Sequence, residues 1–316
     1  MEEKIKMKVD VIMPCFNGEN KISRCLDSFL NQTFKDYKIY FIDDGSTDKT
    51  KDIALMYKKK FEEIGVPFDY LYKENGGATS AVNVGLKEDL QGEYLLSMDS
   101  DDVLPKYSLE HRVKFLDENK RYSAVGGWVY SKNYETGKII RIEKCKAFSG
   151  NKSETVKNII LCRNLVFAGY LFRKKEFFNS VGRNIYESMG GQNFQILIPF
   201  AHNFLFKILD EVTMIITVEN DSHSSINMKT KEKFLQYEDR LCKIVSETLN
   251  KMKAPQIYYD WALIRHNFNL MNLGYKFKDQ EIFDENYKIL KKNTLVKVLG
   301  LKSFVKRILM KIRNII

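Results

Sequence analysis

Three aspartates in the stretch Asp99-Ser100-Asp101-Asp102 are the side chains of this sequence most suited to chemistry. They follow the apolar run of residues 94–98, which predicts a buried strand. An ionised carboxylate at the end of such a strand is costly unless it finds hydrogen bonds or a cation. Because side chains alternate along a strand, Asp99 and Asp101 should point the same way. The pair predicts a site for a hard divalent cation that also binds phosphate oxygens; a turn with helix-capping aspartates is the alternative.

Strands alternate with helices along the first 105 residues. Short apolar runs are each followed by a segment with apolar residues at helical spacing, which predicts βαβ units and a parallel sheet. In a parallel sheet, ligands bind outside the carboxyl ends of the strands. The predicted strands are residues 9–13, 37–42, 68–72 and 94–98, and the helices between them are 18–30, 48–64 and 81–86.

Polar residues stand at the carboxyl ends of all four predicted strands, where such a sheet would build its site. The glycine-rich patterns of a dinucleotide site or a P-loop are missing after the first strand. The sequence therefore favours a nucleotide held through aspartates and a metal. The four strand-end stretches are Pro14-Cys15-Phe16-Asn17, Asp43-Asp44-Gly45-Ser46, Asn75-Gly76-Gly77 and Asp99-Ser100-Asp101-Asp102.

The chain after residue 105 predicts two further parts. A helix to about residue 120 is followed by strands near 123–130, 138–142, 170–172 and 212–218, with helices near 153–162 and after 191. From residue 230 the pattern is wholly helical, with segments near 230–250, 256–273, 279–292 and 295–315. We therefore expect one α/β domain over 1–228 and a helical region over 229–316, with the domain edge near residue 228.

The composition indicates the cellular compartment and the class of binding partner. Five cysteines without a Cys-x-x-Cys pair favour a reducing compartment over a disulfide framework or a zinc site. We expect neither a signal peptide nor a transmembrane helix, because no apolar run is long enough. The net charge of +10 comes from residues 288–316, which hold nine basic residues and no acidic one. The remaining chain is near neutral, so a nucleic-acid partner is not expected.

The four strand-end stretches resemble, in order and spacing, the family 2 glycosyltransferases of the GT-A fold. The matching text is Val11–Glu19, Ile42–Asp48, Asn75-Gly76-Gly77 with Asn83, and Met98–Asp102. The resemblance implies a GT-A fold, which has a mixed, mainly parallel sheet, here with a C-terminal helical region. Residues 1–228 would be the catalytic domain, with a nucleotide-binding half (1–105) and an acceptor-binding half (106–228). The implied activity is inverting transfer of a sugar from a nucleotide diphosphate sugar, with UDP favoured and Mn²⁺ or Mg²⁺ as cofactor. It also implies a saccharide or lipid-linked acceptor in surface-polysaccharide synthesis. A nucleotidyltransferase fits less well, because its glycine-rich, arginine-bearing first loop is absent.

The resemblance also assigns roles to individual residues. Asp101 is expected to bind the metal directly, and Asp99 to contact the metal, its water or the ribose. Phe16 would lie against the nucleobase or, alternatively, in the core. Asp43 and Asp44 would accept hydrogen bonds from the base and the ribose, or simply form a turn. Asp102 would be a second ligand or a helix cap. The further donor-binding candidates are Pro14, Asn17, Glu19, Asn75, Gly77, Asn83 and Ser100.

Two departures from the family pattern concern catalysis. Val82 stands where the family commonly has an arginine that approaches the nucleotide. Gln192 and Asn193 stand where it usually has an acidic pair that supplies the general base, and an amide cannot act as a base near neutral pH. Glu187 is the nearest substitute, with a surface acid as the alternative, and Gln192 and Asn193 are then expected to bind the acceptor. The amides also leave open a catalytically silent nucleotide-sugar-binding protein.

Two features near the end of the chain extend the prediction. His223, on a loop after a predicted strand, is either a further metal ligand or a solvated histidine. Residues 295–316 place apolar residues at helical spacing among basic ones, which is typical of a helix on an anionic membrane surface. A helix docked on its own domain or on a second subunit is the alternative. We thus expect a cytoplasmic protein, peripheral at the inner face of the cell membrane.

Overall fold

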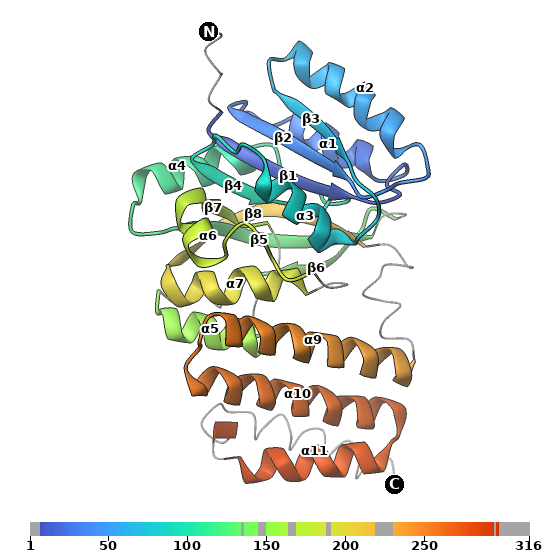
Figure 1. Cartoon of the computed structure of the whole chain (residues 1–316), viewed down its shortest axis with the longest axis vertical. Helices are drawn as coiled ribbons and strands as arrows, with labels where there is room; N and C mark the ends of the chain where they lie inside the picture. Colours follow the sequence, from blue (N-terminus) through green and yellow to red (C-terminus); the bar gives the residue numbers. More distant parts are fainter. Residues whose placement is uncertain are drawn as a thin grey trace. The chain divides into compact units, whose positions relative to one another are not determined.

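The computed structural model describes residues 7–133, 136–144, 150–163, 169–187, 191–218, 230–293 and 295–296. The chain forms two compact units, Met1–Ser222 and His223–Ile316. The domain edge expected near residue 228 falls outside the described residues and stays a prediction. Figure 1 shows the elements of both units in chain order.

The first unit is built on an eight-stranded mixed sheet, as predicted. Strands β3, β2, β1 and β4 are neighbours in that order and run parallel. Strand β7 is antiparallel to both β4 and β5, β6 lies antiparallel at the far edge, and β8 runs parallel to β5. The strands are β1 (Val9–Cys15), β2 (Tyr37–Asp43), β3 (Phe68–Tyr72), β4 (Tyr94–Ser97), β5 (Ala124–Asn133), β6 (Ile139–Glu143), β7 (Leu171–Arg173) and β8 (Phe206–Val218).

Helices cover this sheet through their apolar stripes. In α1 the buried residues Ile22, Cys25, Leu26 and Phe29 recur at helical spacing and join the core formed with β1 and β2. Helix α3 packs especially close, because a Cβ on Gly85 would lie 2.6 Å from Ile12. The helices of this unit are α1 (Ile22–Leu30), α2 (Thr50–Glu63), α3 (Ala78–Lys87), α4 (Ser108–Glu118), α5 (Lys152–Ile160), α6 (Lys174–Ser180) and α7 (Gln192–Asn203).

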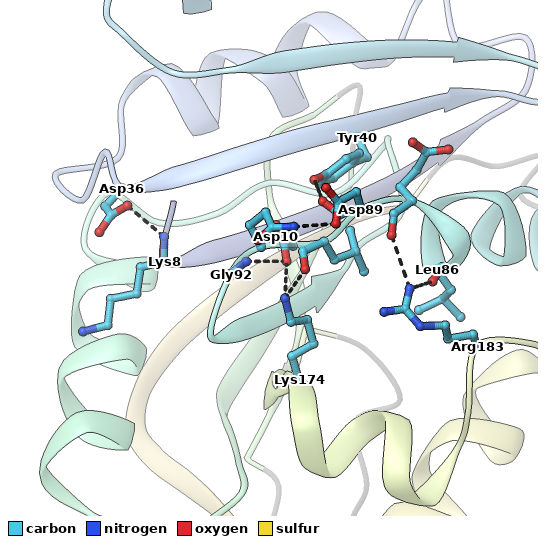
Figure 2. A network of polar contacts seen from close by, with 12 residues as sticks. Lys8, Asp10, Asp36, Tyr40, Leu86, Asp89, Gly92, Lys174 and Arg183 are labelled. Atoms are coloured by element: carbon cyan, nitrogen blue, oxygen red, sulfur yellow. Dashed lines mark hydrogen bonds and ion pairs between the residues drawn. The ribbon is translucent and has the colours of Figure 1, made fainter. Parts of the chain in front are cut away.

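A buried ion pair between Asp10 and Lys174 binds the start of β1 to α6 (Figure 2). It lies at the opposite end of β1 from the predicted site. The Asp10 carboxylate accepts a hydrogen bond from the Gly92 N–H at 2.8 Å and lies 3.3 Å from Lys174 Nζ. Burial raises the pKa of Asp10, and the charge of Lys174 acts in the opposite direction. The pair joins β1 to the start of α6, far along the sequence, and so fixes the sheet on which the site is built.

In its described residues, the second unit is helical, as predicted. Helices α9 (Lys231–Lys251), α10 (Gln256–Phe277) and α11 (Gln280–Lys292) match the three expected segments before residue 293. The buried Glu238 of α9 binds α9 to α10, because it lies 3.6 Å from Arg265 and accepts a hydrogen bond from Asn269 at 2.9 Å. The basic helix expected over 295–316 lies, beyond residue 296, outside the described residues. No helix in the described part of the chain is both long and apolar enough to cross a membrane.

Candidate active site

The three aspartates that follow β4 form one carboxylate cluster. One ligand oxygen from each of Asp99, Asp101 and Asp102 lies within 4.8 Å of the others, and this is the only such acidic group among the described residues. Asp99 is exposed, Asp101 half-buried and Asp102 buried. The loop is fixed from the other half of the unit, because Val103 and Ile215 of β8 exchange backbone hydrogen bonds of 3.0 and 2.8 Å. The predicted strand-end cluster is therefore present.

The carboxylates of the cluster repel one another, and this repulsion contributes to the raised pKa values of two of them. Burial, followed by the charges of Asp99 and Asp101, raises the pKa of Asp102 well above its usual range. The pKa of Asp99 is raised to about 6 by desolvation among the surrounding protein atoms and by the charge of Asp101. The Asp99 side chain is exposed to solvent, so of these two causes of its raised pKa the repulsion by Asp101 matters more for ligand binding. A divalent cation would remove this repulsion, so the three carboxylates fit a hard metal ion.

The capping alternative for Asp102 is wrong. Helix α4 begins at Ser108, its N-cap position is Tyr107, and no side chain caps it. The Asp102 carboxylate instead accepts a hydrogen bond from the backbone N–H of Thr217 in β8. Asp102 thus belongs to the carboxylate cluster.

The loop after β1 is bound to the loop after β2. Asn17 has a left-handed backbone (φ +47°), its N–H donates to Ser46 Oγ at 2.9 Å, and its side-chain oxygen accepts from the Thr47 N–H at 2.9 Å. Glu19 likewise accepts from the Lys49 N–H at 3.1 Å. The two loops therefore form one surface, and the donor contacts predicted for Asn17 and Glu19 stay predictions beside these structural bonds.

Two aromatic side chains stand exposed at the ends of β1 and β3. Phe16 is 51% exposed, so the alternative that placed it in the core is wrong. Tyr72, which is 62% exposed, was not predicted; it pairs in register with Asp43, which pairs with Cys15 of β1. Pro14 is buried within β1. Flat apolar surface of this kind suits a nucleobase, and Tyr72 could have been proposed because it ends an apolar strand.

Asp43 and Asp44 are buried and already hold protein donors. Asp43 accepts hydrogen bonds from the Ser46 N–H at 2.8 Å and from the Tyr70 hydroxyl at 2.6 Å. Asp44 lies 2.6 Å from Lys73 Nζ and accepts from the N–H groups of Gly76 and Gly77 at 3.0 and 2.7 Å. The two carboxylates thus fix the loops after β2 and β3. Contacts from them to a base or a ribose stay predictions.

Close packing brings these two loops together. Gly45 has a φ of +79°, and a Cβ at this position would lie 2.6 Å from the backbone nitrogen of Asn75. Only glycine permits both this conformation and this approach. Gly77, with a φ of +87°, is the N-cap of α3. Lys73 is a cation beside these loops that the sequence did not single out, whereas Val82 is buried and offers none.

The candidate base Glu187 lies beside Asn83, which was expected to contact the nucleotide. Asn83 is buried and binds the backbone of Ile185 with both ends of its amide, while Glu187 is exposed and lies 3.5 Å from Asn83 Nδ2. Gln192 and Asn193 are half-buried at the start of α7. The nucleotide contact predicted for Asn83 stays a prediction, and what the structure shows is a link to Glu187.

Ser100 and His223 complete the predicted set. The Ser100 hydroxyl hydrogen-bonds with the Cys15 thiol, and burial raises the pKa of that thiol to about 12, so the sulfur stays protonated. His223 lies outside the described residues, and its role as a metal ligand stays a prediction.

Similarity to known proteins agrees with this geometry. The chain is 28% identical over 288 residues to the poly(ribitol-phosphate) beta-N-acetylglucosaminyltransferase TarP of Staphylococcus aureus, covering 86% of this chain and 85% of TarP. With several glycosyltransferases from Rickettsia species, the alignment spans only 28% to 32% of the relative's length.

Solved structures show the same fold. TarS 1–349 of S. aureus in complex with UDP-GlcNAc matches with a TM-score of 0.57 at 19% identity, over 89% of each chain. The mannosyltransferase PcManGT from Pyrobaculum calidifontis, in complex with GDP-Man and Mn²⁺, matches with a TM-score of 0.55 at 12% identity, over 94% of this chain and 79% of that one. At these identities the likeness concerns the fold alone, which is the predicted GT-A fold.

The model of the family described as glycosyl transferase family 2 matches residues 10–177. That range is just over half of the chain and contains the aspartate cluster and all three loops bound beside it. This protein belongs to glycosyl transferase family 2.

Proposed function

We propose that this protein transfers a sugar, with inversion, from a nucleotide diphosphate sugar to a saccharide or lipid-linked acceptor in the synthesis of a cell-surface polysaccharide. The observation that carries the proposal is the cluster of Asp99, Asp101 and Asp102 after β4. The loops after β2 and β3 are bound to each other by hydrogen bonds to the buried Asp44. UDP is the favoured nucleotide, because TarS was solved with UDP-GlcNAc. A poly(ribitol phosphate) acceptor is suggested by the name of TarP.

The leaving group of such a transfer is a nucleoside diphosphate. Asp101 and Asp99 are the proposed ligands of Mn²⁺ or Mg²⁺, with Asp102 as a further candidate in the same cluster. When bound, a divalent ion stabilises the negative charge that develops on the departing diphosphate. The protein's part is to hold the carboxylates at the strand ends and to present Phe16 and the loop after β3 to the nucleotide.

The acceptor hydroxyl must lose a proton as it attacks the anomeric carbon. Glu187 is the proposed general base, because it is an exposed carboxylate beside Asn83, whereas the amides of Gln192 and Asn193 cannot take a proton. The amides of Gln192 and Asn193 are proposed to bind acceptor hydroxyl groups through hydrogen bonds.

The donor and the metal are tested together by thermal stabilisation of the full chain. UDP-, GDP- and dTDP-sugars are compared with and without Mn²⁺. A ligand that binds the native state raises the melting temperature, and at equal concentration the ligand with the lower Kd raises it more. We expect stabilisation by the UDP-sugars, and only with Mn²⁺. Equal stabilisation without the metal would contradict the role of the aspartates, and a preference for GDP-sugars would contradict the choice of nucleotide.

A catalytically silent nucleotide-sugar-binding protein is the second candidate, favoured by the amides at Gln192 and Asn193. Both candidates bind the donor, so only turnover distinguishes them. Release of UDP from UDP-GlcNAc in the presence of poly(ribitol phosphate), with the glycosylated polymer as product, supports the transferase. Binding without either product supports the silent protein.

Attachment to the inner face of the membrane is proposed from the sequence alone, because residues 297–316 lie outside the described residues. Each basic residue near an anionic surface contributes about 1 kcal/mol. We expect the full chain to sediment with vesicles containing phosphatidylglycerol at 0.1 M salt, and a chain lacking residues 295–316 to stay in the supernatant. An undiminished pellet after the deletion would contradict the proposal.

A further inference from the structure

Hydrogen bonds to two helices, α3 and α7, hold the segment that carries the proposed base. Residues 183–187 follow α6 without forming a helix or strand of their own. Arg183 donates to the carbonyl of Leu86 near the end of α3 at 2.9 Å, a contact visible in Figure 2. Gln195, buried in α7, donates to the carbonyl of Tyr186 at 2.9 Å. An irregular segment with an exposed glutamate is thereby fixed from both sides.

Asn83 makes the central contact. It is only 1% exposed, and its side-chain amide is matched to one residue of the segment: Nδ2 donates to the carbonyl of Ile185 at 2.8 Å, and Oδ1 accepts from the Ile185 N–H at 2.7 Å. Because a backbone N–H can only donate and a carbonyl can only accept, this pairing fixes the orientation of the amide.

The second hydrogen of the Asn83 amide lies toward Glu187. Nδ2 is 3.5 Å from Glu187 Oε1, so the amide reaches the carboxylate as well as the backbone two residues before it. A side chain with both amide atoms on Ile185 is poorly placed to serve a nucleotide. It is well placed to hold Glu187 in one position relative to α3.

We propose that Asn83 is a positioning residue for Glu187: it acts on the proton transfer through the segment of residues 183–187 and does not contact the donor. This rests on the proposed role of Glu187 as general base. Helix α3 is the support for this arrangement, since Asp44 fixes its start through the Gly76 and Gly77 N–H groups while Arg183 binds near its end. The donor loop and the base therefore share one rigid element.

The test uses the full chain, with UDP-GlcNAc and poly(ribitol phosphate) as probes. Asn83→Leu keeps the size of the side chain but removes the three amide contacts. Because a misplacement of about 1 Å can lower a rate by roughly 10²-fold, we expect kcat to fall about that far while the Kd for UDP changes less than twofold. Asn267→Leu is the matched control, because Asn267 is also a buried helical asparagine but lies in α10.

A double-mutant cycle with Glu187→Gln separates positioning from a general structural role. If Asn83 acts through Glu187, Asn83→Leu should cause little further loss of kcat in the Glu187→Gln background. An equal fold-loss in both backgrounds, an unchanged kcat, or a weakened Kd for UDP would overturn the positioning role. Full activity of Glu187→Gln alone would instead overturn the base assignment, and the positioning role with it.

Discussion

Replacing Asp101 by alanine is expected to abolish sugar transfer and the Mn²⁺-dependent part of UDP binding. The Asp101 carboxylate is the half-buried member of the cluster and lies within 4.8 Å of two others, so its loss removes one of the proposed metal ligands. A metal ion contributes several kcal/mol of charge stabilisation in the transition state, which corresponds to a fall in turnover of roughly 10³-fold. Calorimetric titration of UDP with and without Mn²⁺, together with product formation, measures both effects.

The control for this substitution is Asp52→Ala, which removes an exposed carboxylate from α2. It also removes one negative charge but leaves the cluster intact, so transfer and UDP binding should stay within twofold of the native protein. Unchanged Mn²⁺-dependent UDP binding in Asp101→Ala would show that the cluster does not hold the metal.

Replacing Asp44 by alanine is expected to destabilise the first unit and to weaken donor binding together. The carboxylate is 3% exposed and holds Lys73, which is 19% exposed, as well as two backbone N–H groups. Removing one partner of such a pair leaves a poorly hydrated cation and unpaired donors, at a cost of about 3 kcal/mol. Urea unfolding followed in parallel with the Kd for UDP measures both losses.

The pair of Lys38 and Asp69 provides the comparison for Asp44. Its atoms are equally close, at 2.6 Å, but its side chains are 27% and 43% exposed. Asp69→Ala should therefore cost less than about 1 kcal/mol, because water screens an exposed pair. A loss in Asp44→Ala no larger than that in Asp69→Ala would mean that burial of the Asp44 pair does not matter to the fold.

The parts of the site that are continuous in sequence could be predicted. The strand-end stretches at residues 14–17, 43–46, 75–77 and 99–102 each combine an apolar strand with polar residues, and a parallel sheet brings such ends to one edge. The three aspartates were expected at the end of a strand, but β4 ends at Ser97 and they lie in a turn, in which the Asp102 N–H donates to the Asp99 carbonyl at 3.3 Å. The sequence around Asp44 did not reveal its hydrogen-bond partners, because Lys73, Gly76 and Gly77 reach it only through the packing of two loops.

Contacts between distant parts of the chain could not be predicted from the sequence. Asn83 and Ile185 are 102 residues apart, and nothing in either sequence neighbourhood indicates the other. Strand β8 begins at Phe206, six residues before the expected start, because Lys207, Asp210 and Glu211 obscure the apolar pattern of a strand that pairs with β5. The three-residue strand β7 was predicted, but its place between β4 and β5 depends on tertiary packing.

The attachment of the aspartate loop to β8 limits how this protein can be divided. Backbone bonds join Val103 to Ile215, and the N–H of Thr217 reaches Asp102, yet both β8 residues lie beyond the stretch that the family shares, residues 10–177. The proposed nucleotide-binding half, residues 1–105, is therefore not a portable module, although its motifs are contiguous. A chimera that joined it to the acceptor half of another relative would also replace the strand that supports its own carboxylates. Acceptor preference and donor affinity are thus expected to change together when halves are exchanged.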